Sequence, residues 1–151
     1  MSIFYKLLDD GTAIILTRQP ELVEGQLAVK FNGAPPEATA VFYLDDMNFY
    51  RPLNDGRCSV PVDKFQGDIQ VTVAVFDDAT PMTKWCCEGL KVTRTPDGAV
   101  WIAPNDMNLP QEIANIRIRL DELRRMVETL RKSNQELEKE LESIKEGYDL
   151  V

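Results

Sequence analysis

The sequence contains no histidine, and only three of its 151 residues are cysteines. Histidine is the commonest general base and the commonest metal ligand, so its absence removes the usual Ser–His and Cys–His nucleophile arrangements. Cys58, Cys86 and Cys87 form neither an even set for a disulfide framework nor a C-x-x-C motif. We therefore predict that the chain is not an enzyme, with no catalytic residue and no metal site. The cysteines are expected to be half-buried strand residues in a reducing compartment.

Motifs that bind phosphates or cofactors are missing as well. There is no G-x-x-x-x-G-K, no G-x-G-x-x-G and no G-x-S-x-G pattern. The neighbouring acids Asp45–Asp46 and Asp77–Asp78 are interpreted as solvated turn carboxylates rather than as loose calcium ligands, because no EF-hand loop surrounds them. The sequence predicts no cofactor.

Positive charge is scarce: 17 Lys and Arg stand against 25 Asp and Glu, for a net charge of −8. Residues 1–104 hold nine basic against fourteen acidic residues, and residues 105–151 hold eight against eleven. Neither part has the basic footprint of a protein that binds nucleic acid or an anionic membrane. No apolar run approaches the roughly 20 residues of a membrane span. We expect a soluble protein made in a cytoplasm, with no nucleic acid or membrane as partner.

The most regular feature of the sequence is a heptad repeat in its last third. A 3.5-residue apolar repeat over five heptads is typical of a left-handed coiled coil. An ordinary amphipathic helix usually has a wider apolar face, and here only Met126 widens the stripe. The pattern continues to Val151, and Asn134 is its one strongly polar member. The predicted oligomerisation seam consists of Ile113, Ile116, Leu120, Leu123, Val127, Leu130, Asn134, Leu137, Leu141, Ile144 and Tyr148.

A two-sided stripe cannot bury itself, so it implies a partner helix, and the simplest partner is another copy of the chain. In a parallel bundle the Asn134 side chains meet in one layer and can hydrogen-bond. In an antiparallel pair each would face a leucine and lose about 1–3 kcal/mol as an unpaired buried amide. Charge segregation, +2 over residues 111–132 and −4 over residues 133–151, favours the antiparallel pair. Exposed ion pairs contribute only a few tenths of a kcal/mol each, so we predict a parallel homo-oligomer.

The number of helices in the bundle is left open by the seam. Asn134 at an a position, with leucines at several d positions, favours a dimer. Isoleucines at Ile113, Ile116 and Ile144 favour a trimer.

Residues 1–104 have the pattern of β-strands. The clearest alternation is at residues 69–76, and turn residues separate it from the other candidates. About seven short antiparallel strands predict an all-β, immunoglobulin-like sandwich in which one face of each sheet is wet. Pro61 predicts an edge strand or a strand start. The candidate strands are residues 12–17, 26–31, 39–44, 57–62, 69–76, 84–94 and 99–103.

Four aromatic residues are assigned to packing within this β-domain. A surface that binds sugar or protein is the less favoured interpretation. They are Phe49, Tyr50, Trp85 and Trp101.

Three parts follow in order: a β-sandwich head at 1–104, a linker at 105–110 and a coiled-coil oligomerisation helix at 111–151. Asn108 is the expected N-cap, Pro110 falls in the first turn, and Gly147 is expected just beyond the end of the helix. Because the linker is only a few residues long, we expect the head to stay close to the start of the stalk.

The segment FYLDDMNFYRPLNDGRCSVPVDKFQGDIQVTVAVFD contains an acidic turn with glycine, then Cys-x-Val-Pro, a polar run, a glycine and an alternating strand. This order resembles the N-terminal domain of tail and baseplate accessory proteins of phages that infect Gram-positive bacteria. In that family an immunoglobulin-like β-domain precedes a proline-marked joint and a heptad helix, as Pro104 and Pro110 precede the heptads here. The resemblance implies a virion structural protein, often trimeric, whose β-domain docks on other virion proteins.

The sequence thus favours a non-enzymatic homotrimer of β-heads on a coiled-coil stalk, located in a phage particle assembled in the host cytoplasm. Two other functions remain open. One is a cytoplasmic adaptor whose helix pairs with a different protein, and the other is a small carbohydrate-binding module.

Overall fold

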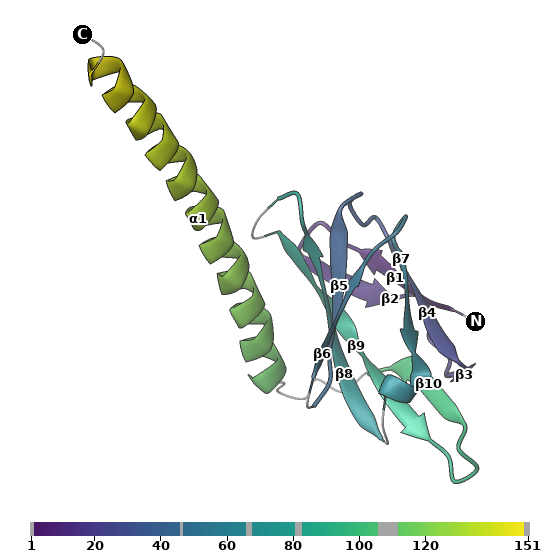
Figure 1. Ribbon diagram of the computed structural model, residues 1–151. Coiled ribbons are helices and arrows are strands. Elements are labelled where there is room, and N and C mark those ends of the chain that lie inside the picture. The colour runs from purple at the N-terminus through teal and green to yellow at the C-terminus, as the bar shows by residue number, and fades with distance from the viewer. Residues whose placement is uncertain (1, 46, 66–67, 81–82, 106–111, 150–151) are drawn as a thin grey trace.

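The computed structural model describes residues 2–45, 47–65, 68–80, 83–105 and 112–149. Within these residues the chain forms ten β-strands, one short 3-10 helix and one long α-helix, which extends well beyond the β-domain (Figure 1). The strands are β1 Ser2–Leu7, β2 Thr12–Ile15, β3 Glu21–Val23, β4 Gln26–Asn32, β5 Ala38–Tyr43, β6 Asn48–Pro52, β7 Arg57–Pro61, β8 Ile69–Asp77, β9 Lys84–Arg94 and β10 Val100–Pro104. The 3-10 helix is Val62–Lys64, and the α-helix, α1, is Glu112–Asp149.

The strands join into one hydrogen-bonded sheet, in the order β6-β5-β8-β9-β2-β1-β4-β7. The sheet curls nearly into a barrel, and β10 pairs with both β3 and β9 beside this path. Most pairs are antiparallel, but β1 pairs in parallel with β4, and β2 with β9. The prediction of a β-rich head is confirmed. The prediction of about seven antiparallel strands is corrected, because the described residues form ten strands and two of the strand pairs are parallel. The 11-residue strand β9 makes the continuous sheet possible, because it pairs with β8, β2 and β10 along its length.

The seven strands expected from sequence correspond to β2, β4, β5, β7, β8, β9 and β10, and the additional strands are β1, β3 and β6. Strand β7 ends at Pro61 and lies at one end of the strand order, as the proline predicts. The inward positions of the strands form one core, in which the rings of Tyr5 and Phe31 stack with centroids 4.9 Å apart.

Strand β5 and the middle of β8 are buried on both faces. Their inward side chains join the main core, while Val41, Tyr43, Ala74 and Phe76 point the other way. These four residues form a second, smaller cluster that is completed by Ile118 of α1. A strand covered on both sides gains from continuous apolar sequence, which explains why Val73–Phe76 is buried without alternation.

Helix α1 therefore has two parts along its length. Its first turns pack on β5 and β8, and the remainder projects past the head (Figure 1). The expected helix is found, but Gly147 lies inside it rather than beyond its end. The expected N-cap Asn108 and most of the predicted linker lie outside the described residues.

Candidate oligomerisation seam and the head–helix junction

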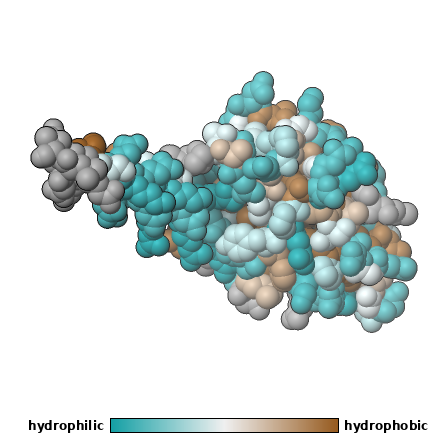
Figure 2. Space-filling model, turned by 45° about the horizontal axis from the view of Figure 1, so that its top comes forward, coloured by the Kyte–Doolittle hydropathy of each residue, from teal (hydrophilic) through white to brown (hydrophobic). Residues whose placement is uncertain are grey.

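The predicted seam forms an exposed apolar stripe along α1. Eight of its large apolar side chains are each 40–61% exposed. Asn134 is exposed in the same stripe, whereas only the backbone is described at Ile113 and Tyr148, and Val151 lies outside the described residues. Most of the helix surface visible in Figure 2 is hydrophilic, with apolar residues showing at its edge. The eight are Ile116, Leu120, Leu123, Val127, Leu130, Leu137, Leu141 and Ile144.

A different face of α1 contacts the head. Ile118, two residues after the seam residue Ile116, is only 4% exposed because it packs into the cluster on β5 and β8. Ile116 by contrast is 59% exposed. Two isoleucines only two positions apart thus have opposite environments, because they project from different sides of the helix.

Asp121, one turn further along α1, is a buried carboxylate in this junction. It accepts hydrogen bonds from the hydroxyl groups of Tyr43, at 2.6 Å, and Tyr50, at 2.8 Å. Burial raises the pKa of Tyr43 well above its usual value, and the hydrogen bond to the Asp121 carboxylate raises it further. The neutral tyrosine is therefore the form that belongs to the docked helix.

Glu122 is the second buried acid of the junction, and it is bound by two cations. The ammonium group of Lys84, from β9, forms a salt bridge with one carboxylate oxygen. Arg119 on the same helix approaches the other oxygen at 3.3 Å. The Lys84 contact joins β9 to α1, and removing Lys84 would leave the buried Glu122 carboxylate without this partner.

Two arginines complete the junction at its edges. Arg125 lies 4.4 Å from the centroid of the Phe76 ring and forms a 2.9 Å salt bridge with Asp78. Arg117 donates hydrogen bonds to the backbone carbonyls of Leu44 and Asp45. Two basic residues near the start of α1, where positive charge opposes the helix dipole, thus bind an acid and two backbone carbonyls of the head.

The docking face and the seam lie on opposite sides of the helix. An α-helix turns by about 100° per residue, so the mean direction of the docked side chains is roughly 180° from that of the a and d positions. The docked residues are Ile118, Asp121, Glu122 and Arg125. The head therefore leaves exposed the seam residues whose side chains are described: Leu120 and Leu123, which lie level with the docked residues, are 48% and 40% exposed. The expectation that the head sits close to the start of the stalk is met by these contacts.

The docking face was missed by sequence reasoning, although two signals point to it. Ile118 is an apolar residue at an outward heptad position, where a free coiled coil has polar residues. The uninterrupted apolar runs at residues 40–44 and 73–76 indicate strands covered on both faces. Together they predict a helix packed on the outside of these two strands.

The four aromatic residues considered for a binding surface do not gather in one place. Trp85 and Phe49 are half-buried against the core, and the indole of Trp85 donates a hydrogen bond to the carbonyl of Leu8. Tyr50 belongs to the junction with α1. Trp101 is partly exposed on β10, directly opposite Leu22 of β3.

The cysteines and acidic pairs have ordinary environments. Burial raises the pKa of the Cys58 thiol to about 12, and Cys86 is exposed rather than half-buried as expected. Asp78 binds Arg125 and accepts a hydrogen bond from Thr39. Over the described part of the chain, no group of three or more potential ligands could hold a metal ion.

No helix within the described ranges has the length and apolar character needed to cross a membrane. Comparisons with protein-family models, with curated proteins and with solved structures find no significant match.

Proposed function

We propose that this chain is a non-enzymatic structural protein that assembles through α1 into a parallel homo-oligomer with a coiled-coil stalk. The observation that carries the proposal is the exposed apolar stripe of eight seam residues on the side of α1 away from the head. Contiguous apolar surface of this extent on a soluble protein marks a contact with a partner.

The head–helix junction supports the proposal through its geometry. Helices in a coiled coil lie about 8–10 Å apart, so a partner helix needs the whole seam to be unobstructed. Because the head packs on the opposite side of α1, partner helices can approach along the full stripe, beside the head as well as beyond it. The heads then point outward from the bundle axis.

Direction and copy number follow from the residues of the seam. Asn134 favours a parallel bundle, in which the side chains of the copies meet in one layer. The isoleucines, together with the resemblance to phage tail and baseplate proteins, favour a trimer over a dimer. We propose a virion as its location, with the β-domain, immunoglobulin-like and sandwich-like in class, docking on other virion proteins.

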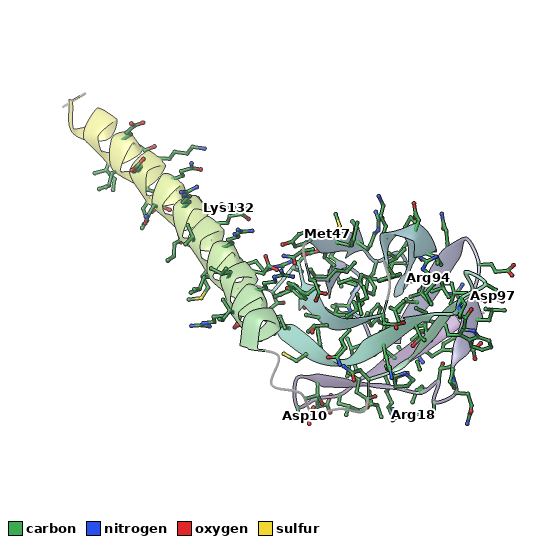
Figure 3. The ribbon with its side chains drawn as sticks, turned by 90° about the horizontal axis from the view of Figure 1, so that it is seen from below. Asp10, Arg18, Met47, Arg94, Asp97 and Lys132 are labelled. Carbon is green, nitrogen blue, oxygen red and sulfur yellow. The ribbon has the colours of Figure 1, made fainter. Side chains whose placement is uncertain are left out.

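Light scattering on the full chain tests the proposal. A trimer of 17.1 kDa chains has a mass of about 51 kDa and a dimer about 34 kDa. The double variant Leu130→Gln/Leu137→Gln should lower the mass toward that of one chain, because it places two amides in the seam without loss of helix propensity. The matched control is Lys132→Gln/Lys139→Gln, which introduces the same residue in the same turns but at outward heptad positions. Lys132 lies on the projecting part of α1 (Figure 3).

A trimeric mass that falls only in the seam variant supports the proposal. A wild-type mass of one chain at micromolar concentration would contradict the homo-oligomer and favour the adaptor, whose helix waits for another protein. A dimeric mass would retain the stalk but reject the trimer.

A further inference from the structure

The curled sheet has a second exposed face, on the strands that α1 does not cover. Along β2, β1, β4 and β7 every second side chain points into the core, so the alternate side chains point outward. Strands β1, β4 and β7 lie on the side of the head away from α1 in Figure 1, and Asp10 and Arg18, which bracket β2, lie along the lower edge of the head in Figure 3. The outward side chains, called the outer face below, are Phe4, Lys6, Thr12, Ile14, Gln26, Ala28, Lys30, Asn32, Arg57, Ser59 and Pro61, with Leu16 directly after β2.

One row of the outer face combines apolar and cationic residues. Strand register places Phe4 beside Lys30, and Lys30 beside Arg57. On the other side of Phe4 lies Leu16, whose backbone N–H donates to the carbonyl of Phe4 at 2.7 Å. Neighbouring strands are about 4.8 Å apart, so the row spans about 14 Å from two apolar residues to two cations.

The charge of the outer face is opposite to that of the protein. The chain has a net charge of −8, yet the outward positions of these four strands hold three cations and no acid. Among the ion pairs within the described residues, none involves Lys6, Lys30 or Arg57. Two acids lie beside β2: Asp10 accepts hydrogen bonds from Thr12, and Glu88 forms a 2.9 Å salt bridge with Arg18.

A shallow groove of about 650 Å³ runs along this row, and Phe4, Lys30 and Arg57 contribute to its lining. A two-residue turn forms its end: Asp55 and Gly56 both have positive φ, and Asn54 and Arg57 exchange backbone hydrogen bonds across it. An added Cβ on Gly56 would lie 2.7 Å from the carbonyl oxygen of Phe31, so the turn is tightly seated against β4. The groove thus has a fixed floor of strands and a fixed end.

We propose that the outer face is the docking surface of the head, and that its occupant is an acidic, partly apolar segment of another protein. Apolar side chains of that segment contact Phe4 and Leu16, and its carboxylates contact Lys30 and Arg57. Charge complementarity selects an acidic partner, because the outward strand positions hold three cations while a single acid, Asp55, lines the end of the groove. The inference names the partner chemistry for the docking role proposed above and rests on that role.

A nucleic acid is the less favoured anionic partner. Tight binding to a phosphate backbone comes from many cations that neutralise successive phosphates. Three cations on a protein of net charge −8 supply too small a basic footprint.

Fluorescence anisotropy on the full chain tests the docking surface. The probe is a fluorescein-labelled peptide of alternating glutamate and leucine; the comparison probes are the same peptide with lysine for glutamate, and labelled oligothymidylate. We expect saturable binding of the glutamate peptide that is about tenfold weaker in Lys30→Gln/Arg57→Gln. Phe4→Ser should weaken it severalfold, because Phe4 is 40% exposed and forms the apolar end of the contact.

The matched control is Lys91→Gln/Lys132→Gln, which also removes two positive charges, one from β9 and one from α1, and should leave binding of the glutamate peptide unchanged. Equal weakening by both double variants, absence of saturable binding, or equal affinity for oligothymidylate or the lysine peptide would each overturn the proposal.

Oligomerisation is measured separately, so the two failures can be distinguished. Lys30→Gln/Arg57→Gln should keep the wild-type mass in light scattering. The seam variant Leu130→Gln/Leu137→Gln should keep its affinity for the peptide, because one peptide contacts one head. If the wild-type protein is an oligomer but does not bind the peptide, the docking surface alone is rejected. If it binds the peptide but has the mass of one chain, the stalk alone is rejected.

Discussion

Tyr43 connects β5 to a buried carboxylate of α1. Its hydroxyl group donates at 2.6 Å to Asp121, and the two residues are only 2% and 7% exposed. Tyr43→Phe leaves one lone pair of a buried carboxylate without its donor, and we expect the free energy of unfolding to fall by about 1–3 kcal/mol. Urea unfolding measures the change. Tyr50→Phe is the control, because Tyr50 is 46% exposed and water can replace its hydrogen bond. Equal losses for the two variants would contradict this account.

The buried tyrosines also predict how stability depends on pH. Burial raises the pKa of Tyr5, and burial with the Asp121 hydrogen bond raises the pKa of Tyr43, in each case above the usual 10.0. The folded protein therefore holds these protons more tightly than the unfolded chain does. Their contribution to stability is complete below about pH 10 and is lost as the pH rises above that value.

Urea midpoints between pH 8 and pH 11 check this expectation. The midpoint should fall above pH 10 in the wild type and fall less steeply in Tyr43→Phe. A urea midpoint that rises above pH 10 would show that ionisation of these tyrosines does not oppose folding.

At the scale of the element, α1 has one face packed on the head and one exposed apolar face, and the isoleucines Ile118 and Ile116 distinguish them. Ile118→Ala removes buried apolar volume between α1 and β5–β8, and losses of about 2–5 kcal/mol are typical for a closed core. We expect faster hydrogen exchange in the first turns of α1 with little change in the mass of the oligomer. Ile116→Ala should weaken the oligomer but leave exchange at the junction unchanged. If Ile118→Ala dissociated the oligomer while Ile116→Ala had no effect, the assignment of the faces would be wrong.

The elements also show what a sequence pattern can predict. The 3.5-residue period located α1. Alternation located strands such as β4, because one side of that strand is buried and the other is wet. Three strands gave weaker signals. Strand β3 has only three residues, β6 is an edge strand ending at Pro52, and in β1 the outward Phe4 interrupts the alternation of apolar and polar residues.

The residues of the candidate site also differ in how well the sequence pattern predicts them. The seam residues were predicted individually, since a heptad repeat specifies each position. The face of α1 that packs on the head was not predicted, because the position of Ile118 in the helix does not reveal which strand it contacts. Its partners, Val41 and Phe76, are distant in sequence and come together only through the pairing of β5 with β8. Likewise the row from Leu16 to Arg57 depends on the parallel pairing of β1 with β4, which local pattern does not encode.

At the scale of the whole molecule, the junction converts a flexible appendage into a defined geometry. A head joined only by a short linker could rotate about the stalk. The contacts of Ile118, Asp121 and Glu122 instead hold one orientation, in which the seam faces one way and the head the other. In a parallel bundle each copy would then present its outer face away from the axis, in the same orientation. Several weak docking contacts presented together give a combined affinity well above that of one head.

Asn134 is the residue whose effect belongs to the whole assembly. In a parallel bundle it forms a polar layer that lowers stability but selects register and copy number. Asn134→Leu should therefore raise the thermal midpoint of the oligomer and, at the same time, broaden its mass distribution in light scattering. The control is Gln135→Leu, which adds the same side chain one residue later, outside the seam. It should change neither the thermal midpoint nor the width of the mass distribution. Asn134→Leu with an unchanged midpoint would mean that the residue is not buried between copies, and the stalk would then need a different partner helix.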